Sequence, residues 1–497
     1  MLLESAGMDK TGSHPESRVV IYGAGEAGEL VVQGLMRLRT ARVRPVAFVD
    51  DDPQKAGKTL SGLPIESAGG PIRPILARYG ADRVLIAMPS APGRRIREIH
   101  KKLLSEEIPA WIVPGLSSIV SSNDPITTFR SVEPEDFLRR HPRVLEKGRV
   151  GPFLKNQRVL VTGAGGTIGQ ELVSQLATFD LESLGCADQS ELAIYQLHEK
   201  FSGHTGTGGK AELFLSDMSR PSDVESVFDE FSPTVVFHAA AYKHVALLEA
   251  APRPAILNNV RSTLHLTQSS RRHDVHTFVH ISTDKAIRPT SLMGATKRIG
   301  ELIVQSAQSE SERQGSDSRF MSVRFGNVLG SSGSVFPKFV EQIKKGGPVT
   351  VTDPRARRYF MLTSEAVELV LLTAAVGHGG RIYLLDLGEP LTITELVNDL
   401  IRFFGKKPGE DIPIVYTGLG PGEKLVEDLS DVPTRPVDEH LLEVIEPPVD
   451  AAWVDPRISA LIESAESNDT DEVFKILERL VPDYRPDRVS GGIASFA

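Results

Sequence analysis

A buried strand that runs straight into a glycine-rich turn and then a helix occurs twice in this 497-residue chain. The more specific occurrence begins with the strand Arg158–Thr162, after which the glycines follow the spacing TGxxGxxG and a helix runs from 170 to about 178. Glycine permits the tight turn and the close approach of a pyrophosphate to backbone amides at the helix N-terminus. The segment predicts a dinucleotide site made by Gly163, Gly166, Thr167, Ile168 and Gly169.

The ends of the next three predicted strands, 183–187, 211–215 and 234–238, support the same site. Asp188 follows the first strand, where a carboxylate can accept hydrogen bonds from the adenosine ribose and repel a 2′-phosphate. NAD is therefore favoured over NADP as the cofactor. Asp217 follows the second strand, and small residues after the third let the cofactor lie against the backbone. The further cofactor-binding residues predicted are Asp188, Asp217, Met218, Ala239, Ala240, Ala241, Asn259 and Lys297.

The earlier occurrence is less specific. The strand Val19–Tyr22 leads into Gly23-Ala24-Gly25-Glu26-Ala27-Gly28 and a helix to about Leu38, and a second strand ends at Asp50. This order predicts a Rossmann-like fold. Two interpretations remain open: a site for a nucleotide or nucleotide-sugar, or a domain retained for packing or regulation. We favour the second, because nothing reactive follows the glycines.

A strand that ends at Ile281 runs into a loop carrying Thr283, Asp284 and Lys285 in succession. A helix follows, in which Met293 and Lys297 lie one turn apart on the same face. Each of these residues also has a purely structural interpretation, as a cap, a surface ion pair or a core side chain. The neighbouring dinucleotide site favours the catalytic interpretation.

Composition excludes several classes of function. The net charge of −9, without a basic run, argues against a nucleic-acid partner. The single cysteine, Cys186, allows no intrachain disulfide. No metal site is predicted, and His238, His244 and His280 are expected to be packed side chains. No window reaches the roughly 18 apolar residues of a membrane span, so we expect a cytoplasmic protein with no integral membrane segment.

Six motifs together resemble the bacterial polysaccharide-biosynthesis nucleotide-sugar 4,6-dehydratases, which are extended short-chain dehydrogenase proteins. The motifs are VLVTGAGGTIG (159–169), HAAAYKHV (238–245), STDKAIRPTSLMGATK (282–297), VRFGNVLG (323–330), RYFM (358–361) and PGEKL (421–425). The resemblance implies a substrate of the UDP-N-acetylglucosamine type. In short-chain dehydrogenases the position of Met293 normally holds a proton-transferring tyrosine, and the resemblance is to the subgroup with methionine there, in which the C5 configuration is kept.

The resemblance implies oxidation at C4, loss of water across C5 and C6, and return of hydride to C6. The loss of water needs a base for the C5 hydrogen and an acid for the C6 hydroxyl. We assign Asp284 as the acid, which requires a raised pKa, and Lys285 as the base, which requires a pKa below the usual 10.4 or so. Since Met293 has no titratable group, Thr283 is assigned to orient the C4 hydroxyl and pass on its proton. Lys297 is assigned to the nicotinamide ribose.

The predicted substrate-binding residues are Lys243, Asn327, Arg358 and Glu423. Arg355 and Arg357 fit either a diphosphate or surface ion pairs, and both interpretations stay open. Two other functions are weighed. A nucleotide-sugar 4-epimerase on the same fold would need no acid for C6, and a catalytically inactive cofactor-sensing protein would not need Asp284 and Lys285.

The predicted fold class is α/β, with two Rossmann-like, doubly wound parallel-sheet units. The second is an extended short-chain dehydrogenase fold with a smaller C-terminal substrate-binding region. The expected segments are a disordered N-terminus (1–17), a Rossmann-like domain (18–115), a linker (116–154), the NAD-binding catalytic domain (155–330), a substrate-binding region interleaved with it (331–450), and a C-terminal tail with one helix (451–497). A homo-oligomer is expected.

Overall fold

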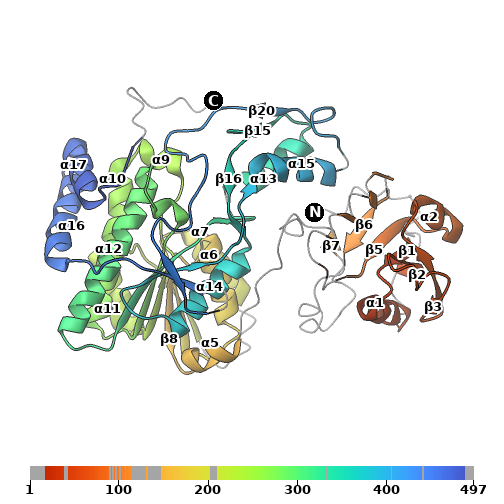
Figure 1. Cartoon of the computed structure of the whole chain (residues 1–497). Coiled ribbons are helices and arrows are strands. Elements are labelled where there is room, and N and C mark those ends of the chain that lie inside the picture. Colours follow the sequence, from red (N-terminus) through yellow and green to blue (C-terminus); the bar gives the residue numbers. More distant parts are fainter. Residues whose placement is uncertain are drawn as a thin grey trace. The chain divides into compact units, whose positions relative to one another are not determined.

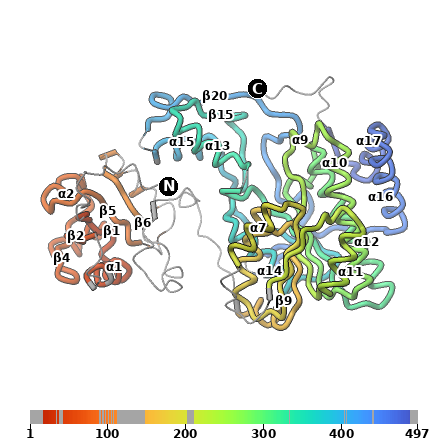
Figure 2. The backbone as a smooth tube through the Cα atoms, turned by 180° about the vertical axis from the view of Figure 1, so that it is seen from behind, coloured from red at the N-terminus to blue at the C-terminus, as the bar shows by residue number. Residues whose placement is uncertain are grey.

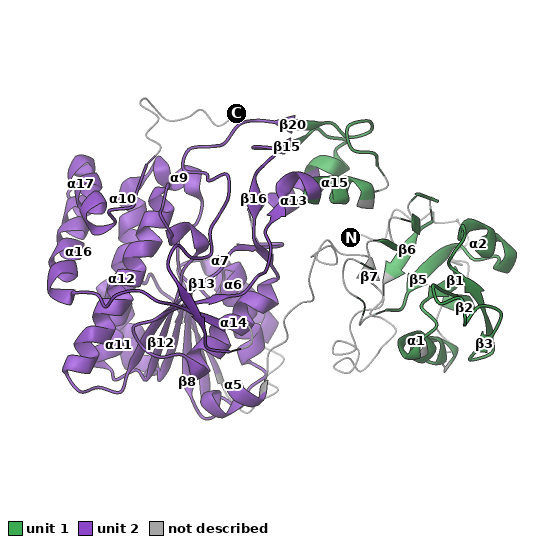
Figure 3. Ribbon diagram, viewed as in Figure 1, with its two compact units in different colours: residues 1–141, 342–349, 396–414 green, residues 142–341, 350–395, 415–497 purple. Residues whose placement is uncertain are grey.

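The computed structural model separates the chain into two compact units (Figure 3). The first gathers residues 1–141, 342–349 and 396–414, and the second gathers 142–341, 350–395 and 415–497. The structure describes residues 17–37, 43–88, 91, 95, 98–99, 102–103, 105–106, 108–112, 130–131, 147–201, 210–331, 333–404, 406–438 and 441–486. None of the helices in these ranges has the length and apolar character needed to cross a membrane.

The first unit is built on a seven-stranded sheet in the order β3-β4-β2-β1-β5-β6-β7. The five central strands are parallel, and β3 and β7 pair antiparallel at the edges. Its elements are β1 (Ser17–Tyr22), α1 (Glu26–Arg37), β2 (Val43–Asp50), β3 (Thr59–Leu60), β4 (Leu63–Ser67), α2 (Arg73–Tyr79), β5 (Arg83–Ile86), β6 (Ala110–Ile112) and β7 (Arg130–Ser131). The predicted strand, glycine turn and helix are present.

The second unit is built on a nine-stranded sheet in the order β10-β9-β8-β11-β12-β13-β18-β22-β21. The first seven strands of this order are parallel, and β22 and β21 extend the sheet antiparallel. The strands are β8 (Arg158–Thr162), β9 (Ser183–Asp188), β10 (Lys210–Leu215), β11 (Val235–His238), β12 (Thr277–Ile281), β13 (Arg319–Arg324), β18 (Ile382–Leu385), β21 (Thr434–Pro436) and β22 (Leu441–Val444).

Helices cover both faces of this sheet, which is why its strands are almost continuously apolar. Val159 and Val161 of β8 face one layer, and Leu160 faces the other. The first layer contains α5 (Lys147–Leu154), α6 (Thr167–Leu176), α7 (Glu191–Phe201) and α14 (Thr363–Val376). The second contains α8 (Pro221–Phe231), α11 (Arg261–Arg272) and α12 (Leu292–Arg313). Figure 1 shows α11 and α12 on one side of the sheet and α14 on the other.

Short elements follow the carboxyl ends of the strands. They are α9 (Val245–Glu249), α10 (Pro252–Ala255), the 3₁₀ turn η3 (Asp284–Ala286), β14 (Asn327–Val328), β16 (Arg357–Arg358), β17 (Phe360–Met361) and β19 (Leu391–Thr392). Four elements cross the unit boundaries: α13 (Val335–Lys344), β15 (Val349–Val351), α15 (Ile393–Phe403) and β20 (Ile414–Tyr416).

The C-terminal segment differs from the prediction of a tail with one helix, which was wrong. It forms two helices, α16 (Ala451–Glu466) and α17 (Thr470–Leu480), which lie beside α12 (Figure 2). The side chain of Asp450 accepts a hydrogen bond from the amide of Ala452 and caps α16. The apolar residues of α16 then recur at helical spacing and are buried: Val454, Ile458, Leu461, Ile462 and Ala465. This apolar face, not the acidic character of the segment, decides its structure.

Two other predicted segments also differ. The sequence pattern over 254–272 predicts one long helix, but the structure divides the segment into α10, a π-helical turn at Ile256–Val260 and α11. The linker expected over 116–154 ends in α5, whose Val150 and Leu154 are buried in the core of the second unit. The sequence also predicts a helix at 134–140 and a glycine-rich surface loop at 203–209, and both lie outside the described residues.

A buried ion-pair network ties the end of β12 to α12 and β13. Glu301 of α12 accepts hydrogen bonds from Arg324 at 2.7 Å through both carboxylate oxygens, and from the hydroxyl of Ser282 at 2.6 Å. Arg298 adds a contact at 2.9 Å. Burial alone raises the pKa of Glu301, but the two arginines outweigh it and lower the pKa from 4.5 to about 2.

Glu301→Gln is expected to lower the free energy of unfolding at pH 7 by about 3 kcal/mol, because it removes the buried charge that pairs with Arg324 and Arg298 and leaves Glu446 as the carboxylate that still contacts both arginines. The stability that ionised Glu301 contributes is fully present above pH 4.5 and is lost as the pH falls toward 2. Urea denaturation over this range is the measurement, and the difference between wild type and variant should shrink as the pH falls. Glu472→Gln, on the solvent-facing side of α17, is the control and should change stability by less than about 1 kcal/mol. An equally small effect at Glu301 would contradict this role.

Candidate active site

Two adjoining cavities lie at the carboxyl ends of the parallel strands in the second unit. The smaller has a volume of about 290 Å³ and the larger about 770 Å³. They share the lining residues Gly166, Ala239, Ala241 and Tyr242. The edge at which parallel strands end is where open α/β sheets bind their ligands.

The glycine turn after β8 has no room for side chains. A Cβ atom at Gly169 would lie 2.0 Å from the carbonyl oxygen of Gly163, and one at Gly163, where φ is +69°, would lie 2.5 Å from the amide nitrogen of Ala240. One carboxylate oxygen of Asp188 accepts a hydrogen bond from the amide of Gly165 at 2.9 Å, and the other accepts from Ser190 at 2.9 Å. The turn is thereby fixed as a cradle whose Gly163, Gly165 and Gly166 line the smaller cavity.

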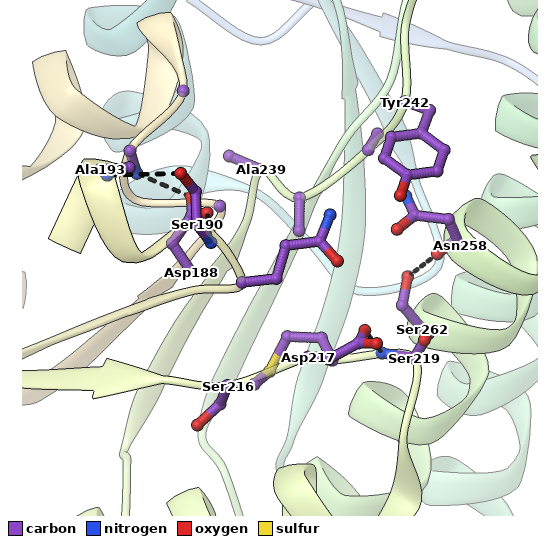
Figure 4. A pocket seen from close by; sticks show the side chains of 17 residues that line it. Asp188, Ser190, Ala193, Ser216, Asp217, Ser219, Ala239, Tyr242, Asn258 and Ser262 are labelled. Carbon is purple, nitrogen blue, oxygen red and sulfur yellow. Dashed lines mark hydrogen bonds between the residues drawn. The ribbon is translucent and has the colours of Figure 1, made fainter.

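Most of the predicted cofactor-binding residues border these cavities. The smaller one is lined by Gly163, Gly166, Asp188, Asp217, Met218, Ala239, Ala240 and Ala241, and the larger by Gly166, Thr167, Ile168, Gly169, Ala239, Ala241 and Lys297. Figure 4 shows Asp188 and Ser190 on one side of the smaller cavity, and Tyr242, Asn258 and Ser262 on the other. Of these, Ser190, Asn258 and Ser262 were not predicted because they belong to none of the six motifs, and Tyr242 was not predicted although it lies in the motif at 238–245.

Asn259 was predicted to bind the cofactor, but it does not line either cavity. Its amide group is buried, where it accepts a hydrogen bond from the amide of Tyr242 at 2.8 Å and donates to the Tyr242 carbonyl at 3.0 Å. It also donates to the hydroxyl of Thr296 at 3.0 Å. The π-helical turn directs Asn258 to the cavity and Asn259 into the protein, so Asn259 positions the loop after β11.

The larger cavity brings together Thr283 and Lys285 from the end of β12 and Met293 and Lys297 from the start of α12. Met293 and Lys297 are one helical turn apart, as predicted, and only 5% of the Met293 surface is exposed. The side chain of Ser291 accepts a hydrogen bond from the amide of Gly294 at 3.1 Å and so fixes the start of the helix. The position that carries a phenol in related enzymes is an apolar cavity wall here.

Lys297 is held by a buried histidine. Its Nζ atom lies 3.1 Å from Nε2 of His280. Burial, with the charge of Lys297, lowers the pKa of His280 well below 6.5, so the imidazole is neutral and accepts this hydrogen bond. Burial likewise lowers the pKa of Lys297 to about 8, although Glu301 opposes it. The remaining N–H donors of Lys297 are available to hydroxyl groups in the cavity.

The predicted packing of the histidines holds for two of the three. His238 and His280 are each only 1% exposed, and Nδ1 of His238 lies 2.8 Å from the hydroxyl of Thr162. His244 is exposed and lines the larger cavity, so the prediction that it is packed was wrong. It lies in the loop after β11 rather than in a strand, which leaves its ring at the surface.

Lys285 is enclosed by oxygen atoms. Its Nζ atom donates to Oδ1 of Asp284 at 3.0 Å and to Oδ1 of Asn327 at 3.1 Å, and it lies 3.7 Å from Oε1 of Glu427. Burial lowers the pKa of Lys285, but the charges of Asp284 and Glu427 outweigh burial, so that the pKa is raised. The protein without ligand therefore holds Lys285 as an ammonium group, the opposite of the shift that a base requires.

Asp284 is 1% exposed and does not line the larger cavity. Two residues that line the cavity, Thr283 and Lys285, contact Asp284. The hydroxyl of Thr283 donates a hydrogen bond to Oδ1 of Asp284 at 2.8 Å. The other carboxylate oxygen, Oδ2, is buried with no hydrogen-bond partner among the described residues. A proton transferred from the cavity through the hydroxyl of Thr283 can therefore be accepted by the carboxylate of Asp284.

The predicted substrate-binding residues divide into two pairs. Lys243 and Asn327 line the larger cavity. Arg358 and Glu423 do not; Arg358 Nη2 lies 2.9 Å from Oε1 of Glu423 in a partly buried ion pair. Arg355 is exposed and pairs with Asp353, so its ion-pair interpretation is the one that the structure favours.

The first unit repeats the glycine-turn geometry of the second. A Cβ atom at Gly28 would lie 2.0 Å from the carbonyl oxygen of Gly23. Asp50 accepts a hydrogen bond from the amide of Ala24 at 2.7 Å, as Asp188 does from Gly165, and it also pairs with Lys55 at 3.1 Å. Both turns therefore combine a closely packed glycine with an aspartate that accepts a hydrogen bond from a backbone amide of the turn.

Comparison with known proteins gives a family match in each of the two units. Residues 159–440 match the family described as polysaccharide biosynthesis protein, and residues 9–114 match the family described as CoA-binding domain. The capsular polysaccharide biosynthesis protein CapD of Staphylococcus aureus is 38% identical over 411 residues, which are 82% of this chain and 68% of CapD. The probable polysaccharide biosynthesis protein EpsC of Bacillus subtilis (strain 168) is 36% identical over 413 residues, 83% of this chain and 68% of EpsC.

Among solved structures, the X-ray structure of Pen from Bacillus thuringiensis matches with a TM-score of 0.54 at 29% identity. The match covers 59% of this chain and 90% of Pen. The predicted α/β fold class, with an extended short-chain dehydrogenase unit, is confirmed.

Proposed function

We infer that this chain, which belongs to the polysaccharide biosynthesis protein family, is a nucleotide-sugar 4,6-dehydratase acting on a UDP-N-acetylglucosamine type of substrate. The observation that carries this proposal is the arrangement at the end of β12. Lys285 faces the larger cavity beside Asp284, the hydroxyl of Thr283 lies between that cavity and Asp284, and Met293 supplies no titratable group. Two proton-transferring groups side by side are what a loss of water requires.

NAD fits the cradle between the two cavities. Side chains at Gly163 and Gly169 would clash with the backbone, so the turn can approach a pyrophosphate closely, and the charge of Asp188 would repel a 2′-phosphate on the ribose. When bound, NAD would supply the hydride acceptor for oxidation at C4 and, once reduced, the hydride for C6. The residues that would hold it are the glycine turn, Asp188, the Ala239–Ala241 segment and Lys297.

Side chains of the protein then transfer the protons of the reaction. Thr283 accepts the C4 hydroxyl proton while it passes its own to Asp284, and this converts Asp284 into the carboxylic acid that the C6 hydroxyl needs for departure. Neutral Lys285 removes the C5 hydrogen, which the 4-ketone makes acidic, and later returns a proton to C5. The proton that left the C4 hydroxyl ends on the departing water, so one turnover restores Asp284.

The test is incubation with UDP-N-acetylglucosamine and NAD in heavy water, followed by mass spectrometry and NMR of the product. We expect a 4-keto-6-deoxy sugar with deuterium at C5, because Lys285 exchanges its proton with solvent before returning it. An unlabelled C4 epimer would identify a 4-epimerase instead, and unchanged substrate would support a cofactor-sensing protein.

A further inference from the structure

Glu427 is a buried carboxylate that the mechanism above does not use. It follows the PGEKL motif by two residues and is 3% exposed. Its Oε2 atom has no hydrogen-bond partner among the described residues, as is the case for Oδ2 of Asp284. A buried carboxylate oxygen that lacks a donor has a site for a proton.

Three cations and one carboxylate face Glu427. Oε1 lies 3.7 Å from Nζ of Lys285 and 4.0 Å from Nε of Arg358, and Oε2 lies 3.8 Å from Nζ of Lys424. The carboxylate is that of Asp284, which accepts a hydrogen bond from Lys285 and acts on Glu427 by its charge. These three distances are those of ion pairs and are too long for hydrogen bonds. An oxygen atom of Glu427 can therefore accept a proton. Burial, with the charge of Asp284, raises the pKa of Glu427 against the opposing effect of the three cations.

The proposed reaction has two protons to accommodate before C5 is attacked. One comes from the C4 hydroxyl, and the other is the extra proton of the Lys285 ammonium group, which must leave before Lys285 can act as a base. Asp284 accepts only one of them, and it gives that one to the C6 hydroxyl. The second proton needs another acceptor, and Glu427 is the other carboxylate next to Lys285.

We propose that Glu427 stores the proton of Lys285 during turnover, an inference that rests on the proposed dehydratase function. The ammonium group turns from Asp284 toward Glu427 on its flexible stem and transfers a proton to the carboxylate. Neutral Lys285 then takes the C5 hydrogen as a proton, and after hydride has reached C6 it returns a proton to C5. Glu427 finally gives its proton back to Lys285, so that charge and proton number are restored. Glu427 acts through Lys285 and is a positioning residue.

This proposal predicts a pH profile that a structural role does not. Transfer from Lys285 to Glu427 changes no net charge, so kcat of the wild type should be flat between pH 6.5 and 8.5 or so. In Glu427→Gln the proton must leave to solvent. Since lysine has an ordinary pKa of about 10.4, only about one molecule in a thousand is then active near pH 7.4, and kcat should rise about tenfold per pH unit.

The control variants separate proton storage from folding. Glu427→Asp keeps a carboxyl group and should restore a flat profile even where kcat is reduced. Asp428→Asn removes a neighbouring, more exposed carboxylate that pairs with Arg288 and should leave the profile unchanged. As a readout independent of turnover, the pH dependence of Lys285 acylation, followed by peptide mass spectrometry, should give a lower pKa for Lys285 in Glu427→Gln than in wild type.

A flat profile in Glu427→Gln, or an unchanged pKa of Lys285, would overturn the role of Glu427 while leaving the dehydratase intact. A wild type that forms no 4-keto-6-deoxy product would instead overturn the proposed function itself, so the two failures are distinguishable.

Discussion

Lys285→Ala is expected to reduce kcat by about 10³-fold or more while NAD binding is unchanged, because the variant lacks the base for C5 and general bases contribute factors of about 10² to 10⁴. Lys285 borders the larger cavity near the sugar, whereas the cradle for NAD is built by the turn after β8. Steady-state turnover and calorimetric NAD binding, measured on the same preparation, test the two halves of this prediction.

The same position offers a sharper variant. Lys285→Arg keeps a cation beside Asp284 but cannot act as a base, since a guanidinium group stays protonated. Loss of turnover in both variants assigns the effect to proton transfer rather than to an unpaired carboxylate. Lys475→Ala, on the exposed face of α17, is the matched control and should be fully active. An active Lys285→Arg enzyme would remove Lys285 from the role of base.

Gly169→Ala is expected to weaken NAD binding by roughly 10- to 100-fold and to destabilise the second unit. The new methyl group would lie 2.0 Å from the carbonyl oxygen of Gly163, and forcing an extra carbon into a packed site costs about 1 to 3 kcal/mol. The backbone must shift, and this opens the cradle. NAD titration and thermal unfolding are the measurements.

Gly151→Ala provides the matched control, since a Cβ atom there has nothing within 4 Å. Gly151 lies inside α5, where alanine is the better helix former by about 1 kcal/mol, so this variant should be slightly more stable and bind NAD normally. Equal losses of NAD affinity in both variants would show that the close contact at Gly169 is not the cause of the weakened NAD binding.

The parts of the site that depend on short spacing were predictable from the sequence. The turn at Gly163–Gly169 and the placement of Met293 and Lys297 on one helical face follow from local geometry alone. Asp188 was predicted from its place after a strand, and it borders the smaller cavity. Local rules suffice where the residues that act together are also close in the chain.

The parts that depend on distant residues were not predictable. The charges of Asp284 and Glu427 together raise the pKa of Lys285, and the contribution of Glu427, which lies far along the chain, could not be predicted from the sequence. Asn258 and Asn259 look equivalent in sequence, and only the π-helical turn decides which one borders the cavity. The prediction of one C-terminal helix omitted α16, in which acidic residues alternate with the apolar residues that form its buried face.

Isotopic labelling of the substrate at C4 is the most direct measurement of the central claim, that acid and base groups after β12 remove water from a sugar oxidised at C4. The substrate is UDP-N-acetylglucosamine with deuterium at C4, and the product is examined by NMR. We predict that the label appears in the C6 methyl group of a 4-keto-6-deoxy sugar. Label retained at C4 of an epimer, or a product whose C6 still carries its hydroxyl, would contradict the proposal.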